Sequence, residues 1–348
     1  MSGILLLLFL WMPQGASAQK SSPASLDTAA QIRPRAQEDS ASGSVAEPPD
    51  QSGLQLNTER RRALQNALDQ RNYKQAEKLL VEEAERDPKS PRTAKILVMA
   101  AGVFFLGGEY PNAVIAWKKA EAITPLDERS RFTLAMAYIR LNRREWARPE
   151  LEKLAAAQAE NPLYPYWLGR LDYDARNYSS AILRFRHVIA LDPQMMRAYD
   201  SLGLCYDYLG QLPEAIDSYN HAVQLNRLQA RPSAWPHVDF AISLVESNRL
   251  PEAEKQLREA AGYDPRLPQT YFQLGRIFEM QGEHQAAIQS LNQAATLDPT
   301  YPEPHYLLGR IYRKLGQGEF ARTEIQRFQG LKKATQTQLA TKPIIPNR

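Results

Sequence analysis

The sequence predicts an all-α protein, a solenoid of about eight helix-turn-helix repeats. The first observation is a pair of helical patterns that meet at a Gly within residues 268–299. Apolar residues in its first half follow the i, i+3, i+4, i+7 spacing of one helix face: Tyr271, Leu274, Gly275 and Phe278. The second half repeats this spacing with Ala287, Ile288, Leu291, Ala294 and Ala295. Pro299 ends the second helix, because proline disfavours a helical conformation in the residue before it.

The second observation is that this pattern recurs. Small residues in matching contexts stand at Ala76, Ala113, Ala147, Ala181, Ala215, Ala253, Ala287 and Ala321. Successive members of this set, the register alanines, are 34 to 38 residues apart. Two short helices cannot bury both of their faces alone, so this period predicts helical hairpins that stack on one another.

The fragments WLGR at 167–170, LGLCY at 202–206, LGRIF at 274–278 and LGRIY at 308–312 each precede a register alanine. Together they resemble the tetratricopeptide repeat (TPR) family over about residues 57–335. The resemblance implies a right-handed superhelix whose first helices line a concave groove for a protein or peptide partner. The first three units depart from the family pattern, with Leu64, Ala101 and Ala135 at the expected glycine position.

Glycine inside the predicted helices requires a reason, because it costs about 1 kcal/mol relative to alanine. It occurs at Gly169, Gly203, Gly275 and Gly309. We expect close helix contact at these positions, with Phe185, Tyr219 and Leu291 filling the space between neighbouring units.

The chain begins with segments that lie outside the repeats. The apolar run at 4–12 is short for a bilayer span and precedes Ala16-Ser17-Ala18, which fits a cleavage site. We therefore predict a signal peptide over 1–18 and an exported protein, periplasmic or extracellular. No Lys or Arg precedes the run, so an uncleaved membrane anchor is the alternative. Residues 19–56 are rich in Ser, Ala, Pro and Gln and predict a disordered linker.

The repeat region is predicted to cover 57–335, followed by a flexible tail over 336–348. Two longer steps place insertions near residues 89–93 and 227–235. The last unit should have a polar outer face, because no further unit covers it. Cys205 is the only cysteine, so no intramolecular disulfide can form, and its helical context predicts a buried, inert thiol.

The sequence contains no pattern typical of an enzyme. The five histidines are scattered without metal-ligand spacing, and neither a phosphate-binding loop nor a nucleophile motif is present. The formal net charge of +4, from 43 basic and 39 acidic residues, does not indicate nucleic-acid binding. We expect no catalysis, cofactor, metal or small-molecule substrate.

The TPR resemblance implies which residues line the groove, at four positions of each first helix or beside them. They are Phe132, Tyr166, Arg170, Tyr173, Phe272, Arg276, Tyr306, Arg310 and Arg313. In three units an aromatic residue precedes an arginine by four positions, so the two share a helix face. Arginine can stack on a ring and bind a carboxylate with its two-pronged guanidinium. This pattern favours an extended acidic or C-terminal peptide as ligand, the alternative being solvated arginines without a dedicated ligand.

Three functions are compatible with the sequence. The first is a non-catalytic scaffold that binds a partner segment in the groove. The second is a structural adaptor that associates with itself, and the third is an accessory or regulatory subunit of an enzyme encoded elsewhere. The Lys and Asn pattern of the carboxylate-clamp TPR proteins is missing, because the first two units carry Arg61, Gln65, Val98 and Gly102.

Overall fold

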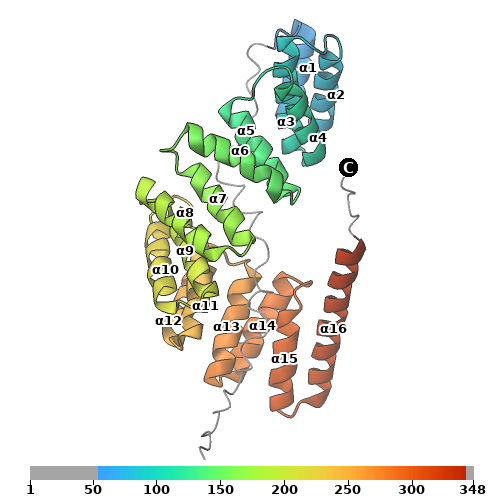
Figure 1. The fold of residues 1–348 in the computed structure, drawn as a ribbon. Coiled ribbons are helices and arrows are strands. Elements are labelled where there is room, and N and C mark those ends of the chain that lie inside the picture. Colours follow the sequence, from blue (N-terminus) through green and yellow to red (C-terminus); the bar gives the residue numbers. More distant parts are fainter. Residues whose placement is uncertain (1–53, 342–348) are drawn as a thin grey trace, which may run out of the picture. The chain divides into compact units, whose positions relative to one another are not determined.

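The computed structural model describes residues 54–341, with side chains to Thr337, and within this range it contains sixteen helices and no strand (Figure 1). The first helices of the repeats, the A helices, are α1 (Thr58–Asp69), α3 (Pro91–Leu106), α5 (Glu128–Arg140), α7 (Leu163–Asp174), α9 (Met196–Tyr208), α11 (Trp235–Glu246), α13 (Pro268–Gln281) and α15 (Glu303–Lys314). The second helices, the B helices, are α2 (Tyr73–Ala84), α4 (Tyr110–Glu121), α6 (Arg144–Ala157), α8 (Tyr178–Leu191), α10 (Leu212–Arg227), α12 (Leu250–Tyr263), α14 (His284–Leu297) and α16 (Gly318–Thr341).

The helices form eight A–B pairs, each packed within itself and against the next. Neighbouring helices in Figure 1 follow one another in sequence order, as expected when contacts are local. The predicted all-α solenoid of about eight repeats is therefore confirmed.

Each turn between an A and a B helix contains one residue in the left-handed region of backbone space. Four of these are glycines: Gly108, Gly210, Gly282 and Gly316. The other four are Arg71, Asn142, Arg176 and Asn248. All eight stand five positions before a register alanine. The turn is thus kept in every unit, including those where the sequence shows no glycine.

The helical glycines lie under large side chains of the paired B helix. A Cβ atom on Gly203 would lie 2.7 Å from Cε1 of Tyr219, and one on Gly169 would lie 2.8 Å from Cε1 of Phe185. Leu291 and Ile325 fill the same place over Gly275 and Gly309. The predicted close contact is present, but it lies within a unit. Phe185, Tyr219 and Leu291, expected to fill the space between neighbouring units, thus also close the space within a unit.

The two ends of the repeat region differ from the predicted boundaries. Leu54 and Leu56 are buried in the first core, and Arg92 Nε donates to the Leu54 carbonyl at 3.0 Å, so the predicted linker does not extend to residue 56. At the other end, α16 continues to Thr341, so residues 336–341 are helical instead of a loose tail. The predicted signal peptide, the linker over 19–53 and residues 342–348 lie outside the described residues.

The exposed surface of α16 is mostly polar, as predicted for a terminal repeat, although Phe320 is 62% exposed. Arg322, Gln326 and Gln329 are exposed there. Cys205 is buried, as predicted, and so is Trp117.

Candidate protein-binding face of the A helices

The predicted groove residues come from four A helices. Phe132 lies on α5; Tyr166, Arg170 and Tyr173 on α7; Phe272 and Arg276 on α13; Tyr306, Arg310 and Arg313 on α15. Consecutive A helices contact one another from α7 through α9, α11 and α13 to α15. Residues at equivalent positions of these five helices therefore form a row, which we call the A-helix row.

Most of the predicted aromatic residues are packed into the core. Tyr166 and Phe272 are each 2% exposed, and Phe132 is 9% exposed. The ring of Phe272 packs against Tyr301, with centroids 5.3 Å apart, and that of Tyr166 packs against Phe185 at 5.9 Å. These rings hold helices together, and the structure leaves them little surface for a ligand.

Helix α15 is the exception. Tyr306 is 39% exposed, and Arg310, four positions later, is exposed beside it. Arg313 is exposed on the same helix and has no acidic partner within the described part of the chain. The ring of Tyr306 packs on one side against Phe328 of α16, with centroids 5.3 Å apart. The predicted pair of an aromatic residue and an arginine is thus partly open to solvent on α15, whereas the pairs on α7 and α13 have a buried ring.

Arg276 of α13 and Arg310 of α15 already have partners. Arg310 Nη2 lies 3.2 Å from Glu279 Oε1, an ion pair that joins α15 to α13. Arg276 Nη1 donates to Gln273 Oε1 at 2.8 Å. Burial lowers the pKa of Arg276, and the carboxylates of Glu246 and Glu279 oppose that shift. Arg276 is therefore less available to a ligand than its place in the sequence suggested.

The middle of the A-helix row is acidic, which the sequence reasoning missed. Asp200 and Asp207 lie on α9, and Asp239 and Glu246 lie on α11. Asp207 accepts hydrogen bonds from the Tyr219 hydroxyl at 2.7 Å and the Ser243 hydroxyl at 2.5 Å. The available signal was the seven-residue spacing of the two α9 aspartates, which places them on one helix face.

The pKa values in this acidic segment follow from burial. Burial raises the pKa of Asp207 to about 6, although its two hydrogen bonds act in the opposite direction, and the charges of Glu246 and Asp200 add to the rise. Burial also raises the pKa of Glu246, with Arg276 opposing it. The row thus contains an acidic segment on α9 and α11 between arginines on α7 and on α13 and α15.

The α7 end of the row is aromatic. Tyr173 packs edge-on against Tyr178 and Tyr208, with centroids 5.7 Å away in both cases. Tyr178 and Tyr208 are stacked at 4.9 Å. Burial is the main cause that raises the pKa of Tyr173, and Arg170 opposes it. Burial likewise raises the pKa of Cys205 to about 12, so this thiol is protonated and unreactive at neutral pH.

Neither a metal-binding cluster nor a membrane-spanning helix occurs within the described residues. No group of three or more His, Cys, Asp or Glu side chains in that range could hold a metal ion. None of the described helices is both long and apolar enough to cross a bilayer. The A-helix row presents charged, hydrogen-bonding and aromatic side chains.

Repeated helical hairpins of this kind define a helical repeat protein. The family model described as "Tetratricopeptide repeat" matches residues 62–128 and 166–234, and the model described as "TPR repeat" matches 275–316. The chain belongs to the tetratricopeptide repeat family.

Solved structures share this fold. A tetratricopeptide repeat protein from Parabacteroides merdae is 16% identical, with a TM-score of 0.58 over 77% of this chain and 98% of that chain. PilF of Pseudomonas aeruginosa is 18% identical, with a TM-score of 0.51 over 61% of this chain and 94% of that one. The Cut9–Hcn1 structure is 17% identical, with a TM-score of 0.50 over 75% of this chain and 50% of the other. At these identities the similarity concerns the fold. No curated protein sequence matches the chain.

Proposed function

We propose that this protein is a non-catalytic scaffold that holds a segment of a protein partner on its A-helix row. TPR arrays typically mediate protein–protein interaction, and TPR proteins are generally non-catalytic. The observation that carries the proposal is the exposed trio Tyr306, Arg310 and Arg313 on α15. Two guanidinium groups beside an exposed ring can bind a carboxylate and stack on a planar group.

The partner segment is acidic or ends in a free carboxylate where it meets α15. Arg313 supports this proposal, since no described acidic residue neutralises it. Arg310 forms an ion pair with one described carboxylate, that of Glu279. On α11 the row presents the exposed carboxylate of Glu246, so the same segment carries a basic residue there. A ligand of mixed charge matches the row better than a uniformly acidic one.

The test is partner capture by the full chain from its native host, followed by mass spectrometry. Arg310→Glu combined with Arg313→Glu should abolish capture of the specific partner, since both residues are exposed and the fold should be unaffected. Arg258→Glu on α12, at a side chain 65% exposed and outside the row, is the matched control. A partner that binds the double variant as well as the natural chain would contradict the proposal.

Two further proposals concern the surroundings of this function. The residues 4–18 support export with cleavage after Ala18, and the mass of the mature N-terminus tests it. A mature chain that begins at Met1 would indicate the anchored alternative. A self-associating adaptor and an accessory subunit of a separate enzyme are tested by solution mass and by the identity of captured proteins.

A further inference from the structure

A recess lies between the B helices α10 and α12. Its volume is about 710 Å³ and its floor includes Phe240 and Leu244 of α11. Leu212 and Ile216 of α10 add apolar surface to one side. We call this recess the B-helix groove. Its volume falls in the range of pockets that hold several side chains of a ligand.

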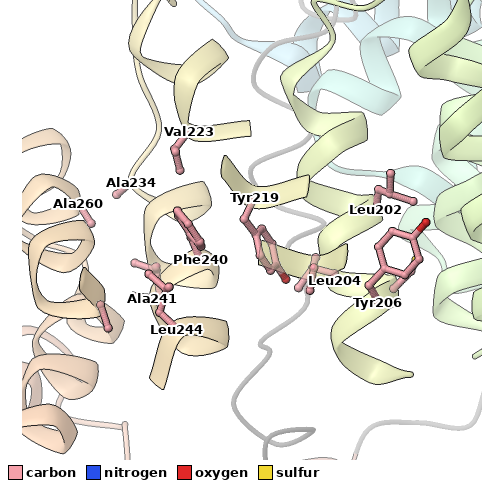
Figure 2. Close-up of a cluster of buried hydrophobic side chains, with 14 of the residues drawn as sticks. Leu202, Leu204, Tyr206, Tyr219, Val223, Ala234, Phe240, Ala241, Leu244 and Ala260 are labelled. Carbon is pink, nitrogen blue, oxygen red and sulfur yellow. The ribbon is translucent and has the colours of Figure 1, made fainter. Parts of the chain in front are cut away.

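The B-helix groove is separate from the A-helix row. On α11 the row contains Asp239 and Glu246, whereas the groove uses Phe240 and Leu244. At about 100° per residue, these two sets lie on different faces of α11. Figure 2 shows Phe240, Ala241 and Leu244 together on α11, with Tyr219 facing Phe240 from the neighbouring helix. The two rings stack with centroids 6.2 Å apart, and this contact holds Phe240 in place on the floor of the groove.

The width of the groove is set by fixed contacts between its two walls. The step between units five and six is 38 residues instead of 34, and the additional residues lengthen both α10 and its connection to α11. Asn226 closes this loop, since its amide donates to the Ser233 carbonyl at 2.8 Å. Arg227 of α10 then binds Glu259 of α12 through two hydrogen bonds, both 2.7 Å. A groove held open in this way loses little conformational freedom when a ligand binds.

The polar groups of the groove indicate its ligand. Asn220 on α10 and Gln256 on α12 place a side-chain amide on each wall. Gln256 uses its oxygen to contact His237 Nδ1 at 2.8 Å, which leaves its NH₂ group as a donor. Amides on both walls suit an extended peptide, because its backbone N–H and C=O groups lack internal partners.

The charges of the groove favour a basic side chain. Arg249 and Glu252 form a pair at 2.7 Å and neutralise each other. Asp217 is exposed on the α10 wall and has no ion-pair partner among the described side chains. Its carboxylate therefore remains to complement a cation. We propose that the B-helix groove binds an extended segment of a protein partner in which an apolar residue is adjacent to a lysine or arginine.

The experiment begins with a random heptapeptide display library selected on the full chain. Selected peptides should share an apolar residue next to Lys or Arg, and a synthetic consensus peptide then gives affinities by fluorescence anisotropy. Asp217→Lys should weaken that peptide by on the order of tenfold and favour a version with Glu in place of the basic residue. Asn220→Trp, at an exposed position on the wall, should block binding while the helicity stays unchanged.

Three controls make the result specific. Glu152→Lys changes an exposed carboxylate on α6, outside the groove, and should leave the affinity unchanged. Arg310→Glu with Arg313→Glu should also leave it unchanged, so a failure here is distinguishable from a failure of the A-helix row. The chain's own segment 342–348 contains Ile344 and Ile345 between basic residues. This segment could therefore compete for the groove. Because we propose a separate partner as the occupant, Ile344→Ser with Ile345→Ser should leave the affinity of the peptide unaltered.

Several outcomes would overturn the proposal. Peptides selected from the library that share no sequence, or that share an acidic sequence, would overturn it. A basic consensus that binds Asp217→Lys and Asn220→Trp normally would place its site elsewhere. An affinity at least tenfold higher in the Ile344→Ser, Ile345→Ser chain would identify residues 342–348 as the occupant, in place of a separate partner.

Discussion

Tyr219 lies so close over Gly203 that a single additional carbon on the glycine would be 2.7 Å from Cε1 of the ring. The ring cannot easily retreat, because its hydroxyl donates to Asp207 at 2.7 Å and its other side stacks on Phe240. One pair of residues thus links both helices of unit five to the first helix of unit six.

Gly203→Ala should therefore destabilise the protein although alanine is the better helix former. Overpacking a fixed core costs about 1 to 3 kcal/mol, which exceeds the gain of about 1 kcal/mol in helix propensity. Gly330 on α16 is the matched control, since a Cβ there would meet no atom within 4 Å. Urea unfolding should show Gly203→Ala destabilised and Gly330→Ala stabilised. A stabilised Gly203→Ala chain would mean that the ring moves freely.

The turn residue Arg176 offers a prediction of the opposite sign. Its φ of 61° places it in the left-handed region, which costs an L-residue on the order of 1 kcal/mol. Arg176→Gly should remove this strain and raise the free energy of unfolding by about that amount. Gly210 occupies the equivalent turn of the next unit with φ 71°, so Gly210→Ala should lower stability. Changes of the same sign in the free energy of unfolding of Arg176→Gly and Gly210→Ala would contradict this interpretation.

Asp207 should make stability depend on pH. Its pKa rises from 3.8 to about 6 on folding, so between these values the folded chain holds a proton that the unfolded chain has released. Stability should therefore fall as pH rises through this window and stay lower above it. Asp207→Asn should remove this slope, a change of up to about 3 kcal/mol between pH 4 and 7.

Thermal melts across this pH range test the prediction, and Glu259 provides the internal contrast. Hydrogen bonding from Arg227 is the main cause that lowers the pKa of Glu259 to about 2. That contribution to stability is present above about pH 4.5 and is lost as the pH falls toward 2. In a plot of melting temperature against pH, Glu259→Gln should thus reduce the slope below about pH 4.5. Asp207→Asn should reduce the slope between pH 4 and 6. Melting curves of Asp207→Asn that run parallel to those of the natural chain would contradict the assignment.

Leu54 should stabilise the first repeat alone. Its side chain is 2% exposed, so Leu54→Ala should cost about 2 kcal/mol or more. Each unit of a repeat protein contacts only its neighbours, so the loss should be local. Hydrogen exchange should accelerate in α1 to α3 and stay unchanged in α13 to α15. Uniform acceleration along the chain would show that the array unfolds as one unit.

Much of the fold could be predicted from the sequence because it depends on local spacing. The register alanines and the helical glycines mark positions where two helices touch, and contact at those positions leaves little choice of residue. The left-handed turns at Arg71 and Arg176 escaped prediction, because an arginine carries no turn signal. The buried Leu54 and Leu56 escaped it as well, since the composition before them is typical of a linker.

The candidate site was less predictable because its properties arise between units. Phe272 is buried by Tyr301, which precedes the next A helix, and Arg310 is paired with Glu279 some thirty positions earlier. Neither contact has a signature within one repeat. The position of a residue in the TPR pattern indicated its helix and face, whereas its exposure and charge balance depended on neighbouring units.

The constant distance of five residues between each left-handed turn and its register alanine has a practical consequence for editing the array. Variation in repeat length, from 34 to 38 residues, lies outside this five-residue stretch, because α3 and α10 are longer than their equivalents, with 16 residues each, and the connections from a B helix to the next A helix differ in length. Whole hairpins could therefore be deleted, duplicated or transplanted by cutting at those connections, with every turn left intact. A shortened or lengthened array built in this way would change how much of a partner it can hold.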